Sequence, residues 1–129
     1  MLNDTLASGL SIVQQNDRQG KRACRVQPAS KTIKCVLDVL NKEGYVGQAE
    51  EAAAARGGQL RVHLLGTINK IGVIKPRFAV KISDFEKFEK RYLPAHGMGV
   101  LIVSTSQGIM THVAAKEKKI GGRLLAYCY

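Results

Sequence analysis

The hydrophobic residues of this 129-residue chain repeat with two different periods. Near the N-terminus, Leu6, Leu10 and Val13 recur at the spacing of one helix face, and residues 33–40 carry the same spacing. Residues 60–64 instead alternate apolar and polar side chains, as a half-buried strand does. Helix and strand signals are therefore interleaved within one short chain, and this predicts an α+β fold.

The two halves of the chain differ in their expected elements. Residues 1–70 are predicted to form a small α/β module in which helix, strand and helix are followed by further strands. Residues 71–129 are predicted to form a mostly-β module with short helices, in which "GVLIV" is a buried strand and "RLLAYCY" a closing strand. Neither half alone can bury much apolar surface, so we expect the two modules to pack together.

Several short signals predict where elements begin and end. Ser83 and Glu86 have the spacing of a capping box at the start of a helix. Thr111 is expected to cap a second short helix, which the glycines at 121–122 would end. Residues 48–59 have a simple, alanine-rich composition, and we expect a hairpin loop or a short helical turn there.

The chain is strongly basic, and its charges are unevenly distributed. Twenty Lys and Arg face ten Asp and Glu, which gives a net charge of +10. Residues 18–34 and 52–83 each contain six basic residues and no acidic one. A generally basic, solvated surface is one interpretation, but segregated charge predicts basic faces, and the usual partner of such faces is nucleic acid.

Other functional classes find little support in the sequence. Cys24, Cys35 and Cys128 lie far apart without a CxxC motif, so we expect reduced thiols and no metal site. A complete phosphate-binding loop and a complete nucleophile elbow are both missing, so we predict neither an enzyme nor a cofactor. We also expect a cytoplasmic protein without a membrane span, because no apolar run approaches about 20 residues.

The stretch "STSQGIMT", residues 104–111, combines four hydroxyl side chains with one glycine directly after an apolar run. Ser and Thr often satisfy the hydrogen bonds of their own turn, so a structural role is one explanation. Small hydroxyls can also bond to phosphates, ribose hydroxyls and base edges, and they allow two backbones to approach closely. Because basic clusters occur on both sides in the sequence, we favour an RNA contact.

These residues and two longer segments resemble the universal small-subunit ribosomal protein number eight family. The segments are "VQPASKTIKCVLDVLNKEGYV" in the first half and "GMGVLIVSTSQGIMTHVAAKEKKIGGRLLAYCY" in the second, and the resemblance covers nearly the whole chain. The middle, "GTINKIGVIKPRFAVKISDFEKFEKRYLP", is more similar to the archaeal and eukaryotic branch. Gln107 departs from the family, because bacterial relatives commonly have a lysine there.

The resemblance implies a structural component of the small ribosomal subunit that acts in the cytoplasm without catalysis or cofactor. It implies binding to the central domain of small-subunit ribosomal RNA, contacts with neighbouring small-subunit proteins, and support of subunit assembly and translation. An RNA-binding regulator of the same fold, acting outside the ribosome, would use the same surface and stays an alternative.

The expected RNA-binding residues form three groups. The family's contact loop carries over to Ser104, Thr105, Ser106 and Gly108, with Met110 and Thr111 alongside. Its N-terminal contact carries over to Ser30 and Lys31, at the start of a helix whose free N–H groups favour phosphate. We expect the remaining cations to supply attraction and phosphate neutralisation: Arg18, Lys21, Arg22, Arg25, Lys34, Lys75 and Arg77.

Overall fold

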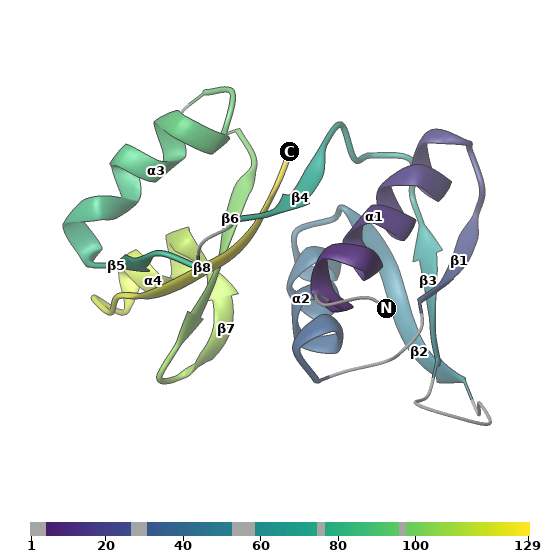
Figure 1. Ribbon diagram of the computed structural model, residues 1–129, viewed down its shortest axis with the longest axis horizontal. Helices are drawn as coiled ribbons and strands as arrows, with labels where there is room; N and C mark the ends of the chain where they lie inside the picture. The colour runs from purple at the N-terminus through teal and green to yellow at the C-terminus, as the bar shows by residue number, and fades with distance from the viewer. Residues whose placement is uncertain (1–4, 27–30, 53–58, 75–76, 96–97) are drawn as a thin grey trace. The chain divides into compact units, whose positions relative to one another are not determined.

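The computed structural model describes residues 5–26, 31–52, 59–74, 77–95 and 98–129. Helices and antiparallel strands are both present, which confirms the predicted α+β class (Figure 1). The chain divides into two compact units, unit 1 with residues 1–68 and unit 2 with residues 69–129. No helix in the described segments is long and apolar enough to cross a membrane.

Unit 1 places two helices against a three-stranded antiparallel sheet with the strand order β1–β3–β2. The predicted helix faces are confirmed, because the predicted apolar residues of both helices are buried: Leu6, Leu10 and Val13 of α1, and Ile33, Val36, Leu37 and Leu40 of α2. Asp17, at the end of α1, is also buried and accepts a hydrogen bond from the backbone N–H of Gly66. The elements are α1 (Thr5–Arg18), β1 (Ala23–Val26), α2 (Lys31–Lys42), β2 (Val46–Ala52) and β3 (Gln59–Leu64).

Unit 2 is built around a five-stranded antiparallel sheet in which β8 is central. The order is β4–β8–β6–β7, and β5 also pairs with β8, so the closing strand is paired as predicted. Phe85 and Phe88 of α3 pack with Leu101, Val103 and Leu124 in the core of this unit. The elements are β4 (Ile71–Val73), β5 (Ala79–Val80), the 3-10 helix η1 (Ile82–Asp84), α3 (Phe85–Tyr92), β6 (Val100–Thr105), β7 (Gly108–Thr111), α4 (His112–Glu117) and β8 (Gly122–Cys128).

The predicted capping box at the start of α3 is wrong. Ser83 lies inside η1, the 3-10 turn that leads into the helix. The carboxylate of Asp84 instead accepts a hydrogen bond from the backbone N–H of Lys81, at 3.1 Å. The preceding 3-10 turn moves the start of α3 to Phe85, so the Ser83–Glu86 spacing no longer matches the first turn.

The predicted end of α4 is also wrong. The helix ends at Glu117, Lys118 is its C-cap, and Lys119 then adopts a positive φ of 57°. Gly121 and Gly122 lie further along, where a Cβ atom on either would collide with a backbone carbonyl oxygen of a neighbouring strand. These glycines therefore allow close strand pairing and do not terminate the helix.

The described part of the alanine-rich tract 48–59 is strand, which differs from the expected loop or helical turn. Residues 48–52 belong to β2 and Gln59 begins β3, so these parts are strand and neither loop nor helical turn. Residues 53–58 lie outside the described part of the chain. β2 and β3 pair antiparallel, with Ala52 opposite Gln59.

Candidate nucleic-acid interface

The hydroxyl-rich stretch forms the hairpin between β6 and β7 in unit 2. Ser104 pairs with Ile109 and Thr105 with Gly108, so the loop between the strands is only the two residues 106–107. Gly108 has a φ of +113°, a conformation that favours glycine. Ser106, Gln107 and Gly108 are exposed, and we call residues 106–108 the hairpin tip.

Two of the four hydroxyls in this stretch have internal partners. The Thr105 hydroxyl donates to the carbonyl oxygen of Gly108 at 2.7 Å and accepts from the N–H of Gln107 at 3.2 Å. The Thr111 hydroxyl accepts from the N–H of Ala114 at 3.2 Å, which confirms the predicted helix cap. Thr111 is buried, so these two threonines stabilise the hairpin and the start of α4.

The two serines are arranged differently. Among the described residues, neither Ser104 nor Ser106 has a side-chain hydrogen bond; Ser106 is exposed and Ser104 is half-buried. Ser104 lies directly opposite Arg123 of β8, and directly opposed side chains share one face of a sheet. The exposed Arg123 therefore lies beside Ser104, although the two residues are distant in sequence. We did not predict Arg123 as a site residue, and its place in the basic segment 116–123 was the only signal in the sequence.

A buried polar cluster lies at the base of the hairpin, where β7 gives way to α4. The N–H of Leu101 donates to Nδ1 of His112 at 3.0 Å, and Nε2 of His112 lies 3.1 Å from Oε1 of Glu89. Because Nδ1 accepts, the proton of the neutral imidazole is on Nε2 and points to the carboxylate. Lys116 donates to the same Glu89 oxygen. These bonds link α3 and α4 to β6.

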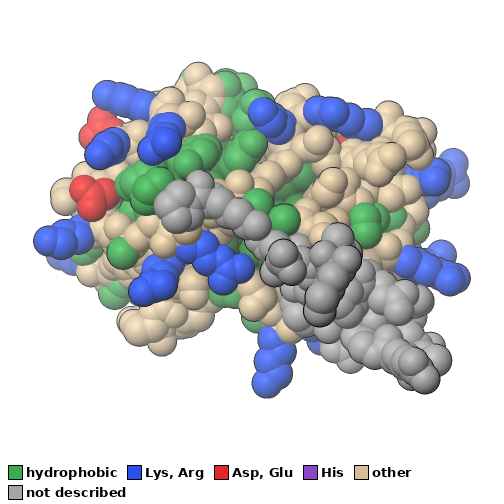
Figure 2. Space-filling view, viewed as in Figure 1, with side chains coloured by type: hydrophobic (Ala, Val, Ile, Leu, Met, Phe, Trp, Pro, Cys, Tyr) green, Lys and Arg blue, Asp and Glu red, His purple; other side chains and the backbone are tan. Residues whose placement is uncertain are grey.

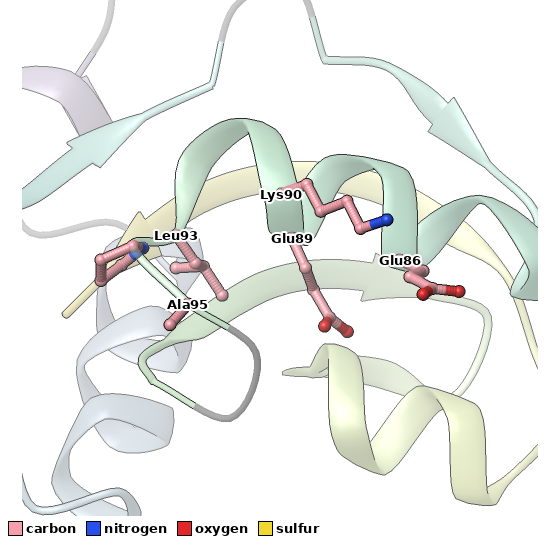
Figure 3. Close-up of a pocket in the computed structure, with 6 residues that line it drawn as sticks. Glu86, Glu89, Lys90, Leu93 and Ala95 are labelled. Atoms are coloured by element: carbon pink, nitrogen blue, oxygen red, sulfur yellow. The ribbon is translucent and has the colours of Figure 1, made fainter.

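The cluster has the residue types of an acid–base site, but its atoms are used structurally. Figure 3 shows Glu89 extending from α3 into a pocket that Leu93 and Ala95 also line. The carboxylate and both imidazole nitrogens already have partners inside the protein. In the described part of the chain, no group of three or more His, Cys, Asp or Glu residues could hold a metal ion.

The predicted cations occur in both units. Arg18, Lys21, Arg22 and Arg25 are exposed between the end of α1 and β1. Lys31 is exposed at the first residue of α2, and Lys34 one turn later is half-buried. Arg77 is exposed just before β5 in unit 2, whereas Ser30 and Lys75 lie outside the described residues. The structure thus brings the predicted residues between Ser104 and Thr111 together in one hairpin. The predicted cations from Arg18 to Arg25 lie at the end of α1, in the turn that follows and in β1.

The described surface has many more basic than acidic side chains. Figure 2 shows Lys and Arg side chains spread over the visible face and few Asp or Glu side chains. Aromatic side chains contribute little to this surface, because Phe85 and Phe88 are buried. The tyrosine rings stack on one another instead, Tyr92 on Tyr127 and Tyr127 on Tyr129. The surface is therefore suited to phosphates and hydroxyls more than to stacked bases.

A comparison with known families agrees with these features. The family model described as Ribosomal protein S8 matches residues 4–129, which is nearly the whole chain.

Proposed function

Because the chain belongs to the ribosomal protein S8 family, we propose that it binds the central domain of small-subunit ribosomal RNA and supports subunit assembly and translation. Membership of the family makes the chain a protein of the small ribosomal subunit, with ribosomal RNA and other ribosomal proteins as partners. We propose in addition the RNA domain that the chain binds, the residues that contact it and the role in assembly. A structural role without catalysis follows the family's character, and the archaeal or eukaryotic branch stays a prediction.

The hairpin of β6 and β7 supports this proposal most directly. Ser104 and Ser106 keep their hydroxyls available, while Thr105 and Thr111 hold the backbone around them in place. Small hydroxyls and the N–H groups of a tight turn can donate to phosphates and 2′-hydroxyls in the shallow minor groove of an RNA helix. A loop that contacts RNA needs accessible hydrogen-bond donors and a backbone that holds them in place.

The predicted cations supply a second, less specific contribution. Exposed lysines and arginines attract RNA over a distance and release counterions when they neutralise phosphates. Arg123 adds a positive charge beside Ser104, where it can pair with the phosphate that the hydroxyls contact. Charge thus provides affinity, and the hairpin provides register.

Filter binding of the full chain to full-length small-subunit ribosomal RNA tests the proposal. The titration is done at moderately high salt with an equal mass of unrelated structured RNA as competitor. The variant Ser104→Ala/Ser106→Ala should lose about 1 kcal/mol per hydroxyl contact, which is roughly 30-fold in affinity for the pair. Its salt dependence should stay unchanged, because no charge is removed.

Ser83→Ala is the matched control, because Ser83 is an exposed serine in the same unit, on η1. Wild-type-like binding by the double serine variant would refute a hydroxyl contact. Co-sedimentation with small subunits at high salt tests the assembly role separately, since a regulator that acts outside the ribosome would not sediment with them.

A further inference from the structure

We propose that Arg25 and Arg61 form a phosphate-binding pair on the open face of the unit 1 sheet, and that this face holds the sugar–phosphate backbone of RNA. The inference rests on the RNA-binding function proposed above and adds a second contact surface to it, in the other unit from the hairpin. Arg61 was not among the residues that the sequence pointed to.

The alternation of burial places both arginines on the same side of the sheet. Each is exposed and lies between two buried residues of its own strand. The buried neighbours face α1 and α2, which contact β1, β2 and β3, so the arginines face away from the helices. The buried neighbours are Cys24 and Val26 in β1, and Leu60 and Val62 in β3.

The strand register places the two arginines side by side. Arg25 and Arg61 are directly opposite partners in the antiparallel pair of β1 and β3. Side chains in such positions have Cβ atoms about 4.5–5.5 Å apart, and like charges placed there destabilise a sheet. Among the residues whose side chains the structure describes, neither arginine has an ion-pair partner.

The acidic residue that faces the pair across the sheet is next to Arg61 and not to Arg25. Glu50 of β2 is opposite Arg61, on the side away from Arg25. Its carboxylate lies 3.9 Å from Nε2 of His63, which is two residues after Arg61 in β3 and so on the same face. An anion between the two arginines would offset the repulsion between them.

A phosphodiester has the chemistry that this arrangement selects. Two guanidinium groups offer paired N–H donors in planar forks, which match the non-bridging oxygens of one phosphate. A hollow lined by Ala23, Cys24, Arg25 and Arg61 opens at this place. The exposed cations Lys21 and Arg22 directly precede β1, so they add positive charge next to the pair in the chain.

The test compares single charge removals in the full-length protein. Arg25→Gln and Arg61→Gln are measured against Lys42→Gln, which removes an exposed charge from the last turn of α2 in the same unit. Affinity for full-length small-subunit ribosomal RNA is followed from 50 to 200 mM salt. Each arginine variant should reduce the slope of log affinity against log salt by about 0.7–0.9. Over this fourfold salt range, the salt-induced loss of affinity should therefore shrink about threefold, whereas Lys42→Gln keeps the wild-type slope.

Thermal unfolding without RNA is the second measurement. Removal of one arginine relieves a like-charge contact, so neither variant should melt below Lys42→Gln. A lower melting temperature would mean that the arginines hold the sheet together, and it would overturn the inference. Slopes equal to that of Lys42→Gln, with wild-type binding intact, would overturn the arginine pair alone. Failure of the wild type to bind this RNA above competitor would overturn the proposed function as well.

Discussion

Removal of the His112 imidazole tests whether the buried polar cluster holds the base of the hairpin. In His112→Ala, the N–H of Leu101 loses its acceptor, and Leu101 is fully buried. An unsatisfied buried donor costs about 1–3 kcal/mol. Glu89 also loses a donor to its buried carboxylate, and hydrogen bonds to charged groups contribute about 1.5–3 kcal/mol. Since Lys116 still bonds to Glu89, we expect a total loss of about 3–5 kcal/mol in the free energy of unfolding.

Tyrosine signals make this measurement possible in unit 2. The chain has no Trp, and three of its four Tyr residues lie in unit 2, at positions 92, 127 and 129. Urea unfolding followed by near-ultraviolet circular dichroism therefore reports mainly on this unit. The matched control is Val113→Ala, because Val113 is the next residue of α4 and is 51% exposed. The control should change stability by no more than about 0.5 kcal/mol.

The reasoning is refuted if His112→Ala and Val113→Ala unfold within about 1 kcal/mol of each other. That result would mean that water or a rearranged neighbour satisfies Leu101 and Glu89 at little cost. The cluster would then not be what links α3 and α4 to β6.

Two further predictions concern close packing and thiol chemistry. Gly122→Ala should destabilise unit 2 by about 1–3 kcal/mol or more, because the added methyl group would collide with the carbonyl oxygen of Ser104; an unchanged urea midpoint would contradict this. Burial raises the pKa of the Cys24 thiol above its ordinary value of 9.0, so the folded state retains a proton that the unfolded chain releases. Stability from the neutral thiol is then present below about pH 9 and is lost as pH rises through the raised pKa. A thiol reagent at pH 8 should label the exposed Cys35 well before the buried Cys24. Equal labelling rates in the folded protein would show that the Cys24 thiol is not buried and that its pKa is not raised.

The hydroxyl stretch, residues 104–111, shows which part of the candidate site can be predicted from the sequence. The residue types predicted a contact loop, and the structure places all of them in one hairpin with an exposed tip. The structure also separates them by their partners: the Thr105 and Thr111 hydroxyls bond within the protein, whereas the Ser104 and Ser106 hydroxyls have no partner among the described residues. Hydroxyls look alike in a sequence, and only the hydrogen-bond partners that the fold supplies decide which of them remain available.

The same limit explains the residues that were missed. The sequence placed Arg61 and Arg123 in basic segments but did not single them out as RNA-binding residues. Their importance comes from strand register, which places Arg61 opposite Arg25 and Arg123 opposite Ser104. Pairing partners far apart in the chain are set by turn geometry and bulges, such as the register shift between Ile102 and Val103. A local pattern contains none of this information.

The sequence by itself determined the fold class, the helix faces and the family. Apolar periodicity is a local property, so Leu6, Leu10 and Val13 already specified a buried face of α1, and alternation in residues 60–64 specified a strand. Net charge is likewise a sum over residues and needs no coordinates. Tertiary structure alone decided which glycines allow strands to approach, which threonines cap or close a turn, and which arginines meet across a sheet. Those outcomes depend on distances between residues that are remote in the chain, and only the folded backbone sets such distances.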